Sequence, residues 1–189
     1  MPIPIEVPTR PQSTHHRTTR ALRSHVPRTA AQSGLVVRPP EPSDGAQMWA
    51  LARDGGELDL NSSYAYLLMA RDFATTCRIA MSDNEIVGYV LGFRPPERPS
   101  HLFVWQVAVR GDQRGRGVAR RMIGHLLETT ESIDALEATV EETNSASRAL
   151  FGSIARQHDA ELTWSEGIPS AHFPDGHAGE PMLRIAPLR

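Results

Sequence analysis

The segment from residue 101 to residue 127 runs from an apolar strand through a glycine-rich loop into an amphipathic helix. The strand HLFVWQVAV (101–109) has only two polar or small residues after its histidine, which predicts a strand that is buried on both faces rather than an edge strand. Residues 118–127 carry apolar side chains at helical spacing. A buried strand that leads directly into such a helix favours an α/β fold.

The rest of the chain extends this alternation. The sequence predicts a strand at 35–37, a helix that begins at Ser43 or Asp44 and ends at Gly55-Gly56, a loop with a short helix at 58–73, strands at 77–82 and 85–94 joined by a two-residue turn, a strand at 136–140, a helix capped by Asn144, and strands at 161–166 and 181–186. The predicted order is β-α-α-β-β-β-α-β-α-β-β. It suits one α/β domain over residues 35–189, which is long enough for a single core.

The first 34 residues differ from the rest in charge. They contain five arginines and one acid, a net charge of +4, whereas residues 35–189 carry −6. This tail has no apolar periodicity, so we expect a disordered basic N-terminal segment. It lacks the apolar core of a secretion signal, and the chain has no apolar stretch of 18 residues, so a cytoplasmic protein without a membrane span is expected. Nucleic-acid binding through this tail would need aromatic residues between the basic ones or a structured basic face, and the sequence shows neither.

The chain has no lysine and one cysteine. The absence of lysine excludes Schiff-base catalysis and phosphate loops of the GxxxxGK[ST] kind, and GC-rich codon usage explains it most simply. The single cysteine, Cys77, excludes an internal disulfide and a cysteine-based zinc site, and its apolar surroundings predict a buried side chain.

The loop QRGRGVA (113–119) is the strongest candidate for a ligand site. Glycines allow close approach of the backbone, and the first N–H groups of a helix favour an anion, so the loop suits a phosphate-bearing ligand. Arg114 and Arg116 would add charged contacts. The alternative is a glycine-rich turn with solvated arginines. A dinucleotide-binding fingerprint is excluded because Arg120 stands where a small residue is required.

Arg114, Gly117 and Ala119 match the R/Q-x-x-G-x-G/A signature, and the chain therefore resembles the GNAT family of acyl-CoA-dependent N-acyltransferases. Asn144 with Ala149 and Leu150 resembles a second segment of that family. The resemblance implies the GNAT fold across residues 35–187, with a mixed central sheet and a splayed pair of parallel strands.

The resemblance also implies acetyl-CoA as co-substrate. Backbone groups freed by a bulge and by the splay would hold the pantetheine and thioester, the loop amides would hold the pyrophosphate, and Asn144 would contact the pantetheine or position the thiol. The implied cofactor-binding residues are Val107, Ala108, Val109, Arg114, Gly115, Arg116, Gly117, Val118, Ala119 and Asn144. One departure is Phe151, which stands where the family has a tyrosine that protonates the leaving thiolate.

Three further stretches resemble the GNAT branch that acetylates L-2,4-diaminobutyrate in ectoine biosynthesis. They are LARDGGELDLNSSYAYLL (51–68), YVLGFRPPERPSHLFVWQVAV (89–109) and TVEETNSASRALF (139–151). The resemblance implies transfer of acetyl to the 4-amino group of diaminobutyrate, and it implies a homodimer. The alternatives are a GNAT enzyme for another small amine or a protein N-terminus, and a catalytically silent acyl-CoA-binding regulator.

A diammonium substrate requires carboxylates in its site. Asp59 is the first candidate, although it could equally form an Asx turn or cap a helix. Trp105 precedes the expected acetyl-binding backbone by two residues and would form a wall of the acceptor site, with core packing as the alternative. Asn61 and Tyr64 are weaker candidates for lining this site.

An attacking amine with a pKa of about 10 must lose a proton, at a cost of about 4 kcal/mol near neutral pH. Family geometry makes Glu180 the candidate base, and a surface acid is the alternative. His172, His177 and Glu180 match no familiar metal-ligand spacing, so we expect two solvated histidines and no metal site.

Overall fold

The computed structural model describes residues 34–56 and 60–188. The predicted tail therefore lies outside the described residues except for Gly34, and its disorder stays a prediction. Within the described ranges the helices and strands follow the predicted order. They are β1 (Val36–Arg38), α1 (Gly45–Gly55), α2 (Ser63–Asp72), β2 (Arg78–Ser82), β3 (Glu85–Phe93), β4 (His101–Val109), α3 (Val118–Thr129), β5 (Ala135–Thr139), α4 (Ser145–Gln157), β6 (Glu161–Ile168) and β7 (Glu180–Ala186).

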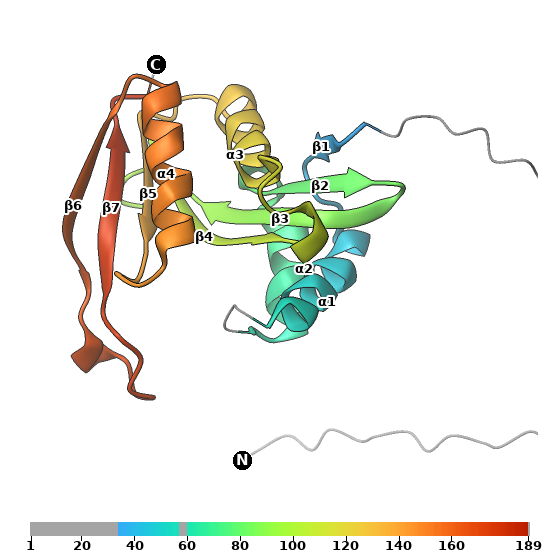
Figure 1. Cartoon of the computed structure of the whole chain (residues 1–189), viewed down its shortest axis with the longest axis horizontal. Helices are drawn as coiled ribbons and strands as arrows, with labels where there is room; N and C mark the ends of the chain where they lie inside the picture. Colours follow the sequence, from blue (N-terminus) through green and yellow to red (C-terminus); the bar gives the residue numbers. More distant parts are fainter. Residues whose placement is uncertain (1–33, 57–59, 189) are drawn as a thin grey trace, which may run out of the picture. The chain divides into compact units, whose positions relative to one another are not determined.

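The strands form one mixed sheet in the order β1-β2-β3-β4-β5-β7-β6 (Figure 1). Neighbouring strands are antiparallel except for β4 and β5, which are parallel. The predicted hairpin between β2 and β3 is present, and both turn residues, Asp83 and Asn84, have positive φ, as two-residue hairpin turns often require.

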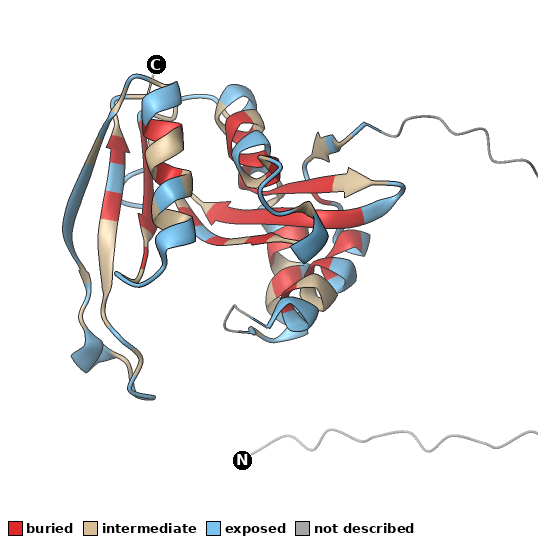
Figure 2. Ribbon diagram, viewed as in Figure 1, coloured by how far each residue is buried: buried red, intermediate tan, exposed pale blue. Residues whose placement is uncertain are grey.

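Helices cover the sheet on two faces and define two cores (Figure 2). The α3–α4 core contains Met122 and Ile123 from α3 and Ile154 from α4, packed against residues of the central strands. The α1–α2 core contains Met48 from α1 and Tyr66 from α2, packed against β2, β3 and β4. Residues on β6 are mostly exposed, as expected for an edge strand.

A bulge interrupts β4 at Trp105. Leu91 of β3 lies opposite Gln106, whereas the next residue, Gly92, lies opposite Val104, so Trp105 is an extra residue without a partner in β3. A Cβ atom on Gly92 would lie 2.9 Å from the carbonyl oxygen of Phe103, which explains the glycine at this position. The bulge therefore depends on close contact between two backbones.

The bulge reverses the alternation of side chains along β4. Val104 lies in the α3–α4 core, whereas Ala108 lies in the α1–α2 core. The prediction that β4 is a central strand covered on both faces is confirmed beyond the bulge, where Ala108 lies in the α1–α2 core and Val107 and Val109 pack against the α3–α4 core. The exception is Trp105 at the bulge, which is 40% exposed. The apolar sequence of β4 reflects its position between two cores on opposite faces of the sheet.

Asp44 does not cap α1 with its side chain. Its carboxylate instead accepts hydrogen bonds from Arg38 at 2.7 Å and from the Glu41 amide at 2.6 Å. Burial raises the pKa of Asp44, but these hydrogen bonds outweigh that effect and hold the pKa below its ordinary value. Asp44 thus joins β1 to the turn before α1.

Candidate active site

The parallel strands β4 and β5 diverge after a short paired region. Their last pair is Phe103 with Glu137, and the rest of β4 has no partner in β5. We call the opening beyond this pair the fork. Val107, Ala108 and Val109 lie on its β4 side while remaining paired with β3. Both the bulge and the splay implied by the family resemblance are therefore present.

The glycine-rich loop connects the end of β4 to α3. Gly115 and Gly117 have φ values of 72° and 75°, a left-handed conformation that disfavours other residues. Gly117 is also the residue that precedes α3, and no side chain caps the first N–H groups of this helix. The start of α3 therefore offers amide donors and the positive end of the helix dipole to an anion.

The loop arginines Arg114 and Arg116 are exposed. Arg114 donates from Nε to the carbonyl of Val109 at 3.2 Å, which ties the loop to the last residue of β4. The structure brings Arg114, Gly115, Arg116, Gly117, Val118 and Ala119 together at one end of the fork.

The second helix at the fork is α4, which follows β5. Asn144 caps it, as predicted, by accepting a hydrogen bond from the Ser147 amide at 3.0 Å. The same residue is exposed, and the cap uses its side-chain oxygen and not its NH₂ group, which is a hydrogen-bond donor. Phe151 is only 3% exposed and packs in the α3–α4 core, where a phenyl ring supplies no proton.

The residues predicted to line the acceptor site lie on α2, just before it, and on β4. Tyr64 and Trp105 are large aromatic residues that are 65% and 40% exposed. A buried hydrogen bond of 3.1 Å from Tyr66 to Gln106 shows that α2 contacts β4 next to the bulge. Asn61 is half-buried just before α2. Asp59 lies outside the described residues, so its predicted role stays a prediction.

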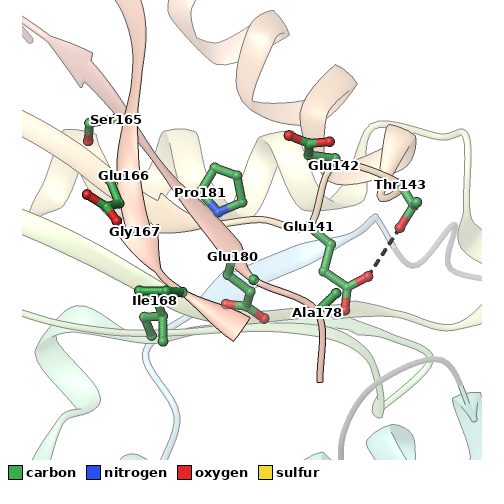
Figure 3. Close-up of a pocket in the computed structure, with 12 residues that line it drawn as sticks. Glu141, Glu142, Thr143, Ser165, Glu166, Gly167, Ile168, Ala178, Glu180 and Pro181 are labelled. Atoms are coloured by element: carbon green, nitrogen blue, oxygen red, sulfur yellow. Dashed lines mark hydrogen bonds between the residues drawn. The ribbon is translucent and has the colours of Figure 1, made fainter. Parts of the chain in front are cut away.

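An acidic cleft of about 470 Å³ lies between the ends of β5, β6 and β7 (Figure 3). Four carboxylates line it, from Glu141, Glu142, Glu166 and Glu180. Glu180 accepts a hydrogen bond from Thr139, so the strand pairing of β5 with β7 fixes its position. The cleft is suited to a cationic ligand.

His177 belongs to the same cluster. Its Nε2 atom lies 3.0 Å from Glu141 and 4.0 Å from Glu180, while Nδ1 lies 2.7 Å from the carbonyl oxygen of Ala178. The expectation of a solvated histidine is wrong for His177, because its side chain is only 20% exposed and is paired with Glu141. His172 is exposed, as expected.

Glu141, His177 and Glu180 also have the composition of a metal site, with ligand atoms within 4.8 Å of one another. A protonated His177 ring satisfies the same geometry by donating to Glu141 and to the Ala178 carbonyl. The contacts of His177 with Glu141 and with the Ala178 carbonyl hold the cluster together.

Sequence reasoning missed two features of this region. Glu141 follows β5 and approaches His177 only because the loop before β7 folds back onto β5, a contact between residues 36 positions apart. Gln106 is a polar residue in an apolar strand, and that isolation was the signal that it accepts hydrogen bonds in a core.

The comparisons with known proteins agree with this geometry. Residues 45–154 match the family model described as the acetyltransferase (GNAT) family. An L-2,4-diaminobutyric acid acetyltransferase from Nocardia farcinica is 44% identical over 81% of this chain and 80% of its own length. Another from Streptomyces coelicolor is 43% identical over 85% of this chain and 97% of its own length.

Solved structures give the same result. The diaminobutyrate acetyltransferase EctA from Paenibacillus lautus, in complex with its substrate L-2,4-diaminobutyric acid and coenzyme A, has a TM-score of 0.78. It is 41% identical to this chain, and the alignment covers 82% of this chain and 96% of that one. Ard1 from Thermoplasma volcanium, at 14% identity and a TM-score of 0.67 over 80% of this chain and 97% of its own, shares the fold.

The chain belongs to the GNAT family of acetyltransferases. Within that family it groups with the L-2,4-diaminobutyric acid acetyltransferases. In the described part of the chain, no helix combines the length and hydrophobicity that a membrane span requires.

Proposed function

We propose that this protein transfers the acetyl group of acetyl-CoA to the 4-amino group of L-2,4-diaminobutyrate, the acetylation step of ectoine biosynthesis. The observation that carries the proposal is the joint presence of a helix start without a side-chain cap after β4 and an acidic cleft that begins after β5, the two strands that diverge at the fork. An anionic acyl donor and a dicationic amine need opposite charges in their sites. The relatives that carry this name support the same substrate pair.

On the donor side, the amides of residues 114–119 hold the pyrophosphate, and Arg114 and Arg116 add charge. The pantetheine lies along Val107, Ala108 and Val109 in the fork, and Asn144 donates to it from the start of α4. Backbone N–H groups at the fork stabilise the oxyanion of the tetrahedral intermediate, a contribution of about 3 kcal/mol in comparable sites.

On the acceptor side, Trp105 and Tyr64 wall the substrate, and Asn61 and Asp59 contact its amino-acid end. Glu180 takes a proton from the 4-ammonium group, which leaves the neutral amine that attacks the thioester, and its hydrogen bond from Thr139 holds the carboxylate in place. Acid–base catalysis of this kind contributes about 10²- to 10⁴-fold to a rate. The leaving CoA thiolate needs no proton from Phe151, because a thiol with a pKa of about 8.5 is already an adequate leaving group.

Transfer is direct, in a ternary complex without an acyl-enzyme. Cys77 is fully buried, and burial raises the pKa of its thiol to about 11. A thiol in that state is a poor nucleophile. Initial-rate kinetics with both substrates varied should give intersecting double-reciprocal lines, and parallel lines would contradict direct transfer.

A thiol-release assay tests the acceptor. Diaminobutyrate should be preferred to diaminopropionate, ornithine, lysine and a peptide amine. Glu180→Gln should lower kcat by about 10²-fold or more. Glu161→Gln is the control, because Glu161 is an exposed acid on β6 outside the cleft. Equal losses in both variants would contradict the role of Glu180.

We also infer a cytoplasmic homodimer, with no metal and no nucleic-acid or membrane partner. The exposed edge strand β6, which carries Trp164 and Ile168, supports an interface between copies. Light scattering of the purified protein should give twice the mass of one chain, and a monomer mass at micromolar concentration would overturn the inference.

A further inference from the structure

One side-chain oxygen in the α1–α2 core joins three elements of the fold. Gln106 on β4 accepts hydrogen bonds at Oε1 from the hydroxyl of Tyr66 on α2, at 3.1 Å, and from the hydroxyl of Tyr89 on β3, at 2.7 Å. The three residues are at most 8% exposed. The tyrosine rings meet edge to face, with centroids 6.0 Å apart.

This group lies between the two aromatic residues assigned to the acceptor site. Gln106 directly follows Trp105, the bulge residue. Tyr66 is two residues beyond Tyr64, on the opposite, buried side of α2. A buried hydrogen bond therefore connects the helix that carries Tyr64 to the strand that carries Trp105.

The same oxygen also fixes the bulge. The extra residue at Trp105 turns Gln106 toward α2, the face on which Ala108 also lies. In a strand without the bulge, Gln106 would share the face of Leu102 and Val104 and would enter the apolar α3–α4 core. Burial of an amide there without partners is strongly unfavourable, so the two tyrosine hydroxyls select the bulged register.

We infer that Tyr66 and Gln106 are positioning residues, which hold α2 and the β4 bulge in the one arrangement where the acceptor amine meets the thioester. This inference rests on the proposed function, because the acceptor site is assigned there. Tyr89 fastens the same oxygen to β3, an element that carries none of the assigned acceptor residues.

Tyr66→Phe and Tyr89→Phe form a matched pair. Each removes one hydroxyl from the same oxygen, but it is Tyr66→Phe that removes the hydrogen bond between α2 and Gln106 itself. Tyr66→Phe should raise the KM for diaminobutyrate about three- to tenfold and leave the KM for acetyl-CoA within about twofold. The two variants should lower the Tm by similar amounts, but Tyr89→Phe should leave both KM values within about twofold. Equal effects of the two variants on the KM for diaminobutyrate would overturn the inference.

A double-mutant cycle tests whether Tyr66 acts through Gln106. Gln106→Leu should raise the KM values for both substrates, because the fork backbone follows the bulge. Adding Tyr66→Phe to Gln106→Leu should change the KM for diaminobutyrate by less than about twofold. Additive effects would mean that Tyr66 acts independently of Gln106 and would contradict the inference.

Hydrogen exchange gives a readout that does not depend on turnover. Amides of α2 should exchange faster in Tyr66→Phe than in Tyr89→Phe, and coenzyme A should slow their exchange in the wild-type protein. If wild-type protein fails to acetylate diaminobutyrate, the proposed function is wrong, while the exchange data still decide whether the connection exists. Unchanged α2 exchange in Tyr66→Phe, or in wild type with coenzyme A, would overturn the inference.

Discussion

The carboxylate of Glu180 on β7 accepts a hydrogen bond from the hydroxyl of Thr139 on the adjacent strand β5. Because β5 and β7 are paired in the sheet, this contact fixes the orientation of the Glu180 side chain in the acidic cleft. The sheet therefore sets the position of the proposed base.

Thr139→Val removes this hydroxyl at nearly constant volume. We expect kcat to fall about three- to tenfold, because Glu180 loses its orienting donor, while the KM for acetyl-CoA stays unchanged. Thr163→Val on β6 is the control, since the Thr163 hydroxyl has only a long contact of 3.5 Å to the Arg184 carbonyl. Steady-state rates measure the effect, and a wild-type kcat in Thr139→Val would show that Thr139 does not orient Glu180.

Gly117→Ala and Gly124→Ala test the start of α3. Gly117 has positive φ, so alanine there should destabilise the protein by about 1–2 kcal/mol and raise the KM for acetyl-CoA. Gly124 lies inside the same helix, where a Cβ atom would meet nothing closer than the Gln157 side chain at 3.9 Å. Alanine there should stabilise the protein by up to about 1 kcal/mol. Urea unfolding measures the stability of both variants, and steady-state kinetics measure the KM for acetyl-CoA. An unchanged KM in Gly117→Ala would argue against the pyrophosphate site.

Asn144→Asp and Asn144→Ala separate the two roles of Asn144. Aspartate keeps the cap on Ser147 but lacks the NH₂ donor, so it should fold normally and bind coenzyme A more weakly. Alanine loses the cap as well and should destabilise the protein by about 1 kcal/mol. Thermal unfolding and calorimetric titration with coenzyme A measure the two effects. Wild-type affinity in Asn144→Asp would limit this residue to capping.

Asp44→Asn tests the connection between β1 and α1. The pKa of Asp44 is below its ordinary value, so its ionised form stabilises the fold above the unfolded-state pKa of about 3.9, and this stability is lost as the pH falls through the folded-state pKa. Near neutral pH the variant should lose about 1–3 kcal/mol. In unfolding curves the difference should disappear under acid conditions, and a constant difference would contradict this cause.

Local sequence patterns predicted the elements and the anion-binding loop because their causes are local. The spacing of Met122 and Leu126, the glycines at 115 and 117, and the cap at Asn144 each act within a few residues. The resemblance to the GNAT family then predicted the fork between β4 and β5.

Features that depend on contacts between distant segments were not predictable in this way. The exposure of Trp105 was not predicted, because the bulge at this residue is set by Gly92 and by partners of Gln106 on α2 and β3. Asp44 was expected at the start of α1, whereas its carboxylate pairs with Arg38, a residue before the turn that the helix pattern does not include. The pairing of His177 with Glu141 arises from the fold of the loop before β7.

The most direct test of the proposed chemistry is NMR of the product formed from acetyl-CoA and L-2,4-diaminobutyrate by the wild-type protein. We expect one equivalent of released thiol and an acetyl group on the 4-amino nitrogen. Acetyl on the α-amino nitrogen, or no thiol release with this amine, would contradict it.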